Sequence, residues 1–153
     1  MDILDVLAGE HGVFYGQFDD LERTLPLATA AEEVQVQAAL LGAAVEAHSA
    51  LEDDLVFTAV EPHLDAGSPD VRGLRMMHEE IADGFGRVRA ARDLDTAREE
   101  FAGVIGLARQ HFLGEETFLF PKARTLLTDE TRAALGATWA DRRGVMRAFG
   151  MWR

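Results

Sequence analysis

The chain of 153 residues has no cysteine, and this absence removes every site that depends on a thiol. A disulfide framework, a zinc site with cysteine ligands, a cysteine-ligated iron–sulfur cluster, an attached c-type haem and a cysteine nucleophile are all excluded. Any metal that this chain binds must therefore use nitrogen and oxygen ligands.

Basic side chains are scarce, because 15 Lys and Arg stand against 27 Asp and Glu, for a formal net charge of −12. This charge repels phosphate backbones and anionic lipids, so we expect neither nucleic acid nor a membrane surface as the main partner. The sequence has no apolar run of the roughly 18 residues that a membrane span needs, and it lacks the cationic start of a secretory signal. A cytoplasmic protein is the resulting expectation.

Hydrophobic residues make up 48% of the sequence and charged residues 27%, as in ordinary globular proteins. A chain of this length buries one core, so residues 1–153 are expected to form a single domain. Apolar residues recur at intervals of three and four nearly everywhere, and no segment alternates with a period of two over the length of a strand. This periodicity predicts an all-α protein.

Prolines and capping residues divide the chain into five predicted helices. Their spans are residues 4–25, 29–60, 68–91, 95–120 and 129–143. Four long amphipathic helices with short connections are buried most economically as an up-down-up-down four-helix bundle. The predicted bundle covers about residues 3–125, and a short additional C-terminal helix and tail cover residues 128–153.

The predicted helix starts depend on side chains that can cap free backbone N–H groups. Thr29 is followed three residues later by Glu32, which is the pattern of a capping box. Ser68 is the expected cap of the third helix, and either Asp95 or Thr96 is the expected cap of the fourth. The sequence leaves the role of residues 144–153 open.

The second and fourth predicted helices carry the same histidine–glutamate pattern. Glu52 follows His48 by four residues, Glu115 follows His111 by four, and a phenylalanine stands nine residues after each histidine. Residues four apart lie on one helix face, about 6 Å from each other, so each pair can direct two donors to the same point. Each pair also lies on an apolar face that is expected to be buried.

The first and third predicted helices match each other as well. Each has one lone histidine, His11 and His78, with apolar residues three, seven and ten positions later. The chain thus consists of two copies of a helix pair, and a bundle with approximate two-fold symmetry would bring all four histidines of the repeat together. Histidines that are satisfied by other core groups, or that lie on the surface, are the alternative interpretation, and the aligned repeat favours a metal site over it.

Four imidazoles and two carboxylates inside an apolar core cost several kcal/mol for each unpaired charge, on the order of 2–7 kcal/mol per group. No set of Lys or Arg on these faces compensates them. A pair of cations bound by the imidazole nitrogens and bridged by the carboxylates would do so. Nitrogen and oxygen donors without a thiolate favour iron or manganese.

These residues resemble the hemerythrin-like (HHE cation-binding) proteins. The resemblance rests on His11, the two His-x-x-x-Glu pairs, His78 and the Glu-Glu-x-x-Leu-Phe-Pro segment after His111, and it covers about residues 3–125. It implies a non-haem diiron centre with an oxo or hydroxo bridge. The carboxylates that match Glu52 and Glu115 would bridge the two irons. By the same resemblance, the lone histidine and the His-x-x-x-Glu histidine of each copy would bind one iron.

The sequence departs from the oxygen-carrying hemerythrins at two positions. These proteins have a further histidine four residues before the one matched by His78, where this chain has Leu74. They also place the last carboxylate five residues after the histidine, where this chain has Glu116, whereas Glu115 preserves the internal repeat. We expect Glu115 to be the ligand, with Glu116 as the alternative. The pattern resembles instead a bacterial subgroup that is associated with peroxide.

Tyr15, the only tyrosine, follows His11 by four residues and therefore lies on the same helix face. It could reach the metals as a phenolate ligand or hydrogen-bond donor, or it could pack in the core. Its counterpart in the second copy is Ala82. The acidic neighbours Asp53 and Glu79 are expected to be solvated.

Loss of one histidine should leave an extra open coordination position, at which peroxide could bind and turn over. The leading hypothesis is therefore a diiron protein that reacts with hydrogen peroxide or dioxygen, above all by catalase-like disproportionation, with Tyr15 as the candidate catalytic residue. A module that binds dioxygen or nitric oxide reversibly, or that senses or stores iron, is the alternative. A structural bundle without metal is a third possibility. The sequence leaves the oligomeric state open.

Overall fold

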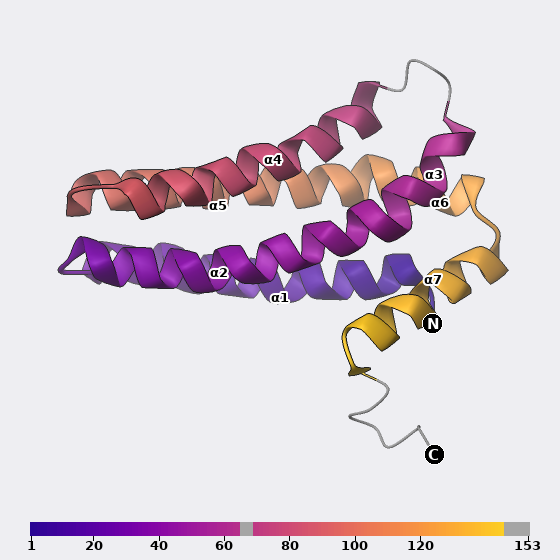
Figure 1. Ribbon diagram of the computed structural model, residues 1–153, viewed down its shortest axis with the longest axis horizontal. Coiled ribbons are helices and arrows are strands. Elements are labelled where there is room, and N and C mark those ends of the chain that lie inside the picture. The colour runs from indigo at the N-terminus through magenta and orange to yellow at the C-terminus, as the bar shows by residue number, and fades with distance from the viewer. Residues whose placement is uncertain (65–68, 146–153) are drawn as a thin grey trace.

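A computed structural model describes residues 1–64 and 69–145 of the chain. All regular elements within these residues are helices, as the all-α prediction requires (Figure 1). The expected cap Ser68 and residues 146–153 of the tail lie outside the described residues. Nowhere in the described part is a helix long and apolar enough to cross a membrane. The cytoplasmic location stays a prediction.

Four long helices form an antiparallel bundle (Figure 1). They are α1 (Ile3–Thr24), α2 (Ala31–Glu52), α4 (Pro69–Ala90) and α5 (Leu94–Gly114). The helices run alternately in opposite directions, and α4 packs against both α2 and α5. The predicted up-down-up-down bundle is therefore confirmed.

The second and fourth predicted helices are each interrupted by a π-helical turn. One turn covers Asp53–Phe57 and leads into α3 (Thr58–Val60), and the other covers Glu115–Leu119 and leads into α6 (Phe120–Leu126). The prediction that the fourth helix ends before Pro121 is wrong. Pro121 lies in the first turn of α6, where its missing N–H is not needed for a helical hydrogen bond.

The expected C-terminal helix is present as α7 (Asp129–Arg142), which packs obliquely against α1 at the end of the bundle that holds the N-terminus (Figure 1). Arg132 of α7 attaches it there, because its Nε donates to Oδ2 of Asp2 at 2.7 Å. The Nη1 of Arg132 donates to the backbone oxygen of Leu127 at 2.6 Å.

Two predicted caps are wrong by one to three residues. The second helix begins at Ala31 and has no capping side chain, and the N–H of Thr29 donates to Glu33 instead of Glu32 at 2.9 Å. Because this helix begins later than expected, the acid that reaches back to Thr29 also lies one position later.

The fourth helix is capped by Asp93 and not by Asp95 or Thr96. The Oδ1 of Asp93 accepts from the backbone N–H of Thr96 at 2.8 Å, and the extended backbone of Asp93 directs its carboxylate at the helix start.

The core consists of two apolar clusters, one toward each end of the bundle. One cluster includes Ile3, Leu7, Leu119, Phe120 and Trp139. The other includes Phe14, Phe18, Val45, Phe101 and Phe112. Between the two clusters lies a layer of buried histidine and glutamate side chains, which is the candidate site.

The close approach of α4 and α5 at Gly84 is testable. A Cβ atom at Gly84 would lie 2.7 Å from Cγ2 of Val104, whereas one at Gly103 meets no described atom within 4 Å. We expect Gly84→Ala to lower the free energy of unfolding by about 1–2 kcal/mol through overpacking. The control Gly103→Ala should raise it by about 0.5–1 kcal/mol, because alanine favours a helix over glycine. Urea unfolding measures both, and equal effects would contradict the close packing.

Candidate metal site

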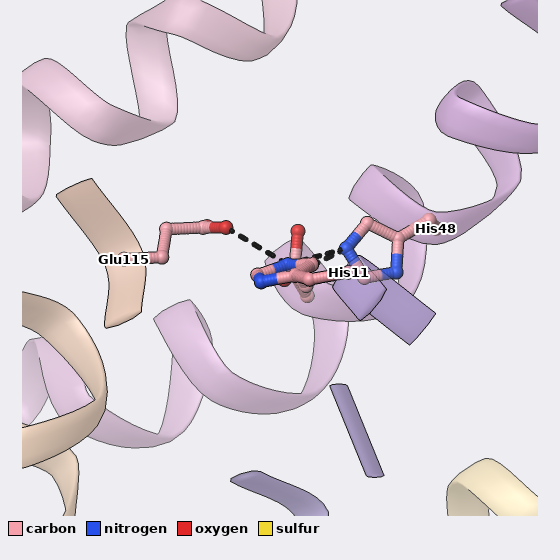
Figure 2. A group of neighbouring side chains, drawn as sticks. His11, His48 and Glu115 are labelled. Atoms are coloured by element: carbon pink, nitrogen blue, oxygen red, sulfur yellow. Dashed lines mark hydrogen bonds and ion pairs between the residues drawn. The ribbon is translucent and has the colours of Figure 1, made fainter. Parts of the chain in front are cut away.

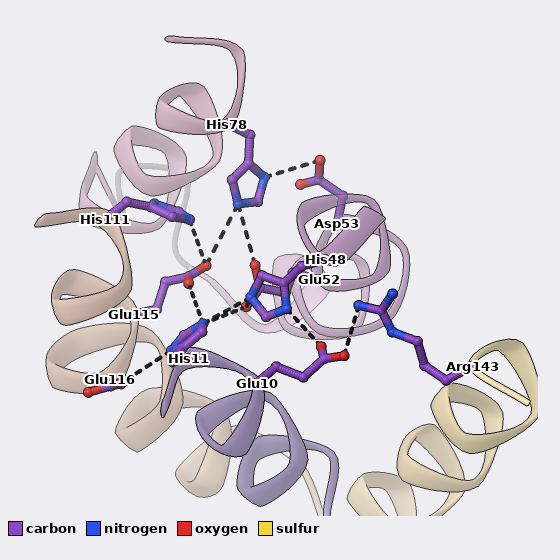
Figure 3. Close-up of polar contacts among 10 residues, drawn as sticks. All are labelled: Glu10, His11, His48, Glu52, Asp53, His78, His111, Glu115, Glu116 and Arg143. Carbon is purple, nitrogen blue, oxygen red and sulfur yellow. Dashed lines mark hydrogen bonds and ion pairs between the residues drawn. The ribbon is translucent and has the colours of Figure 1, made fainter. Parts of the chain in front are cut away.

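The structure brings the six sequence-predicted donors together in the middle of the bundle (Figure 3). We call them the inner cluster, which comprises His11 of α1, His48 and Glu52 of α2, His78 of α4, His111 of α5, and Glu115 at the start of the following π turn. Five of the six side chains are fully buried, and His78 is 9% exposed.

The internal repeat of the sequence is also a repeat of backbone structure. One π turn begins directly after Glu52, and the other begins at Glu115. A π turn rotates the chain less per residue than an α turn does, and such turns are frequent at functional sites. As a result, both members of each acidic pair, Glu52–Asp53 and Glu115–Glu116, contact the imidazoles of the cluster.

The first group of donors consists of His11, His48, Glu52 and Glu115, whose ligand atoms all lie within 4.8 Å of one another. The Nε2 atoms of His11 and His48 are 3.0 Å apart, and Nε2 of His48 is 3.1 Å from Oε1 of Glu52. Glu115 approaches from the opposite side, with Oε2 at 3.4 Å from Nε2 of His11 (Figure 2). Four donor side chains thus converge on one small volume.

The second group consists of Glu52, His78, His111 and Glu115, and its ligand atoms also lie within 4.8 Å of one another. Nε2 of His111 is 3.3 Å from Oε1 of Glu115, and Nε2 of His78 is 3.6 Å from Oε2 of Glu52. Glu52 and Glu115 belong to both groups, and each presents its two oxygens to different histidines. Two carboxylates shared between two sets of imidazoles form an arrangement that can hold two cations side by side.

Several buried atoms of the inner cluster have no hydrogen-bond partner within the described residues. They are Oε2 of Glu52, both ring nitrogens of His78 and His111, and both carboxylate oxygens of Glu115. Unpaired buried polar atoms are expensive, and ligation to a cation would satisfy the Nε2 and carboxylate atoms in this set. The residues present therefore fit a metal centre with nitrogen and oxygen ligands.

Carboxylates outside the inner cluster contact the second ring nitrogen of three histidines (Figure 3). Nδ1 of His48 is 2.8 Å from Oε2 of Glu10, and Nδ1 of His11 is 2.9 Å from Oε1 of Glu116. Sequence reasoning assigned no role to Glu10, and it treated Glu116 only as an alternative ligand. The structure places Glu115 inside the cluster and Glu116 at its edge, with a side chain that is 33% exposed.

The third such carboxylate is Asp53, whose Oδ2 is 3.3 Å from Nδ1 of His78. The expectation that Asp53 is merely solvated is therefore wrong, whereas Glu79 is exposed as expected. The repeat held the signal, because Asp53 and Glu116 stand at the same offset from the histidine of their own helix and each contacts the lone histidine of the other copy.

Tyr15 lies beside His11, with ring centroids 6.5 Å apart, but outside the inner cluster. Burial, followed by the charge of Glu116 and a hydrogen bond to it, raises the pKa of Tyr15 to about 12. The phenol therefore stays protonated at neutral pH in the metal-free protein. A part for Tyr15 in catalysis stays a prediction.

Leu74, which stands where oxygen-carrying hemerythrins have a further histidine, is buried in the apolar core. It packs so closely on Gly114 that a Cβ atom there would lie 2.7 Å from Cδ2 of Leu74. This side of the cluster is thus walled by hydrocarbon.

A groove of about 500 Å³ between α2 and α4 reaches the cluster at His78 and Asp53. Small residues form much of its wall, including Ala38, Gly42, Ala43, Ala50 and Ala82. Because His78 is the one partly exposed histidine of the inner cluster, the groove leads from solvent to the second group of donors.

The electrostatics of the metal-free cluster divide it into a charged and a neutral half. Burial by itself lowers the pKa of His48, but the charge of Glu52 and the bond to Glu10 outweigh burial and raise it to about 9. Burial favours protonation of Glu52, yet His48 holds the pKa of Glu52 well below its ordinary value. Burial and the charge of Glu52 raise the pKa of Glu115 well above its ordinary value. Burial, followed by the electrostatic effect of the neighbouring His78, lowers the pKa of His111 to about 3. Cations that bind here must displace protons, so binding strengthens as pH rises.

This fold and site define a class of protein, a helical bundle that can hold metal ions between buried histidine and glutamate side chains. Residues 2–123 match the family model of the hemerythrin HHE cation binding domain, and the match covers most of the 153 residues. The chain therefore belongs to the hemerythrin HHE cation-binding family, and the resemblance seen in the sequence is confirmed. No curated protein and no solved structure gives a significant match. The bacterial subgroup stays a prediction.

The pKa of His48 predicts how the stability of the metal-free protein depends on pH. Because folding raises this pKa from its ordinary 6.5 to about 9, its stabilising contribution is present below pH 6.5 and is lost as pH rises to 9. We expect the free energy of unfolding to fall by up to about 3 kcal/mol over this window, since each pKa unit is worth about 1.4 kcal/mol. The raised pKa of Glu115 acts in the same direction.

Urea unfolding at a series of pH values measures this loss. His48→Gln, which cannot take up the proton, should show a clearly smaller loss, and metal-loaded protein should show little, because metal replaces the proton. A metal-free protein that becomes more stable between pH 6.5 and 9 would contradict the assignment of charge in the cluster.

Proposed function

We propose that this protein holds a pair of iron ions in the inner cluster and uses them to react with hydrogen peroxide or dioxygen. The observation that carries the proposal is the pair of buried donor groups that share Glu52 and Glu115. His11 and His48 would bind one ion, His78 and His111 the other, and the shared carboxylates would bridge them.

The donor set supports iron over a softer metal. Imidazole and carboxylate suit iron and also manganese, and the chain contains no thiolate. When bound, such ions supply Lewis-acid and redox chemistry that side chains lack. Two divalent ions would also compensate the negative charge that Glu52 and Glu115 bring into the core once both are deprotonated.

The carboxylates outside the inner cluster would hold the imidazoles in the orientation and tautomer that metal binding needs. A carboxylate that accepts from Nδ1 of a histidine keeps the proton on that nitrogen and leaves the lone pair of Nε2 free for a metal. Glu10 is placed to do this for His48 once a cation displaces the second proton of that ring, and Glu116 is placed to do it for His11. The orientation of these two rings is thereby set before a metal arrives.

Aromatic rings would keep bulk water away from the site. The ring of His11 stacks on Phe112, with centroids 4.2 Å apart, and on Phe120 at 5.5 Å. The rings of His78 and Phe57 form a T-shaped pair, with centroids 5.5 Å apart. A dry enclosure strengthens electrostatic interactions and limits side reactions.

Catalase-like disproportionation is the activity that we propose, in which two molecules of hydrogen peroxide give one of dioxygen and two of water. Leu74 supplies no ligand to the second group of donors, and the groove between α2 and α4 ends at this group. A small polar molecule could therefore reach an incompletely ligated position. Reversible binding of dioxygen or nitric oxide, or iron sensing or storage, is the alternative function.

The decisive experiment is to load the metal-free protein with ferrous iron without air, measure the iron content, and then follow oxygen release after addition of peroxide. We expect two iron ions per chain and many turnovers. His48→Ala should lose most of the bound iron, since a missing ligand also leaves a buried charge unpaired. His63→Ala is the matched control and should retain the iron, because His63 is exposed on the turn Glu61–His63.

Two results would contradict different parts of the proposal. Absence of stoichiometric iron from the wild-type protein would reject the metal centre. Two bound irons with less than one turnover and a stable, reversible oxygen spectrum would reject the catalase-like activity and favour the alternative.

The proposed entry route gives a separate prediction. Ala82 lies one helical turn after His78 and lines the groove, at the repeat position that Tyr15 has in the first copy. We expect Ala82→Phe to fill the mouth of the groove and to slow both peroxide turnover and azide binding by about tenfold or more, an effect of about 1.4 kcal/mol. The iron content should not change.

Ala102→Phe is the control for Ala82→Phe, because residue 102 is an exposed position of α5 that does not line this groove. It should leave turnover and azide binding as in the wild type. Equal azide binding rates in the wild type and Ala82→Phe would place the entry route elsewhere.

A further inference from the structure

The first and second groups of donors have the same ligand types, but the groups that contact the second ring nitrogen of their histidines differ. Alignment of His11 with His78 pairs residue 10 with residue 77 and residue 15 with residue 82. The first pair joins Glu10 to Met77, and the second joins Tyr15 to Ala82. At this position of the repeat, one copy therefore has an acid and the other a thioether.

In the first half, Glu10 connects the cluster to α7 (Figure 3). Oε2 of Glu10 is 2.8 Å from Nδ1 of His48, and Oε1 of Glu10 is 2.8 Å from Nη2 of Arg143. The Glu10 side chain is 20% exposed and that of Arg143 is 26% exposed, so this ion pair is largely shielded from water. Arg143 directly follows α7 and lies beyond residues 2–123, which match the family model.

In the second group of donors, which contains His78 and His111, the described residues show no corresponding contact. Nδ1 of His111 is buried and has no hydrogen-bond partner among the described residues. Met77 stands at the position of Glu10, and a thioether sulfur is a weak acceptor. On its Nδ1 side, the ring of His111 is thus in contact with packed side chains and not with a carboxylate among the described residues.

The lone histidines, His11 and His78, also differ in the contact that a carboxylate makes with Nδ1, and the contact is again closer in the first group of donors. Glu116 lies 2.9 Å from Nδ1 of His11 and makes a hydrogen bond with it. Asp53 lies 3.3 Å from Nδ1 of His78, and that nitrogen lacks hydrogen-bond geometry to any described group. Asp53 is also shared with Arg75, whose Nε is 3.2 Å from Oδ1.

A carboxylate behind a ligating histidine fixes the ring and makes its free nitrogen a better donor. Removal of such a partner costs about 10–100-fold in metal affinity. Both histidines of the first group have this support, whereas neither histidine of the second group has a hydrogen bond of this kind.

We propose that Glu10, oriented by Arg143, makes the His11–His48 position the tighter of two unequal metal positions, so that the protein binds and releases its two ions one at a time. This inference rests on the proposed function, in which two divalent ions occupy the inner cluster. The weaker position is the one with His78 and His111, which also faces the groove between α2 and α4. The ion that exchanges more easily is thus the one nearer to solvent.

The test is calorimetric titration of the metal-free, full-length chain with ferrous iron in the absence of oxygen. We expect two binding steps of one ion each, with affinities that differ at least tenfold. Glu10→Gln keeps the size of the side chain but removes its charge, and it should weaken the tighter step by about 10–100-fold. The weaker step should change less than threefold.

Two further variants locate the effect. Arg143→Gln should weaken the tighter step in the same direction but by a smaller factor, because Glu10 keeps its charge and loses only its orientation. Glu79→Gln is the charge-matched control, because Glu79 is an exposed neighbour of His78 and should affect neither step.

A measurement on the wild-type protein alone guards against a variant that does not fold. When protein loaded with two iron ions is exposed to a chelator, we expect one ion to leave quickly and the other at least tenfold more slowly. A single rate for both ions, or two equal binding steps that Glu10→Gln leaves unchanged, would overturn this inference while the diiron site stands. A wild-type protein that binds no iron would instead overturn the proposed function itself.

Discussion

The rest of this structure depends on one constraint, which is that two glutamate side chains are fully buried at the centre of an apolar bundle. Glu52 and Glu115 lie between two hydrocarbon clusters, where an uncompensated carboxylate is unstable. In the metal-free protein at neutral pH this cost is reduced in two ways. His48 is protonated and pairs with the charge of Glu52, and Glu115 retains its proton and is neutral. Cations would replace these protons, which links the stability of the fold to the occupancy of the site.

The bundle has two-fold organisation in its ligands but not in its surroundings. Asp53 and Glu116 exchange partners across the pseudo-symmetry axis, because each contacts the lone histidine of the other copy. The symmetry ends at Glu10, which joins the cluster to Arg143 and whose counterpart in the second copy is Met77. One half is therefore tied to α7, and the other opens toward a groove. A pair of metal positions built from equal ligands can differ in this way through its neighbours alone.

Much of the fold and of the inner cluster could be predicted from local pattern. Periodicity of three and four identifies amphipathic helices because it places apolar residues on one face, and a histidine four residues from a glutamate lies on one face for the same reason. The choice of Glu115 over Glu116 as the inward acid also followed from the repeat. The predictions at Pro121 and Thr29 were wrong, because a proline in the first turn of a new helical segment does not end the helix and a cap depends on where the chain becomes extended.

By itself, the sequence determined the helical class, the two-copy pattern and the six histidine and glutamate residues that form the inner cluster, since these depend on spacing within single helices and on the match between helices. Only the tertiary structure decided the partners of the outer carboxylates. Glu10 adjoins His11 in the chain yet contacts His48, and Arg143 reaches Glu10 from the end of α7, more than a hundred residues away. Such contacts depend on how α1, α2 and α7 pack, and no local spacing encodes that packing.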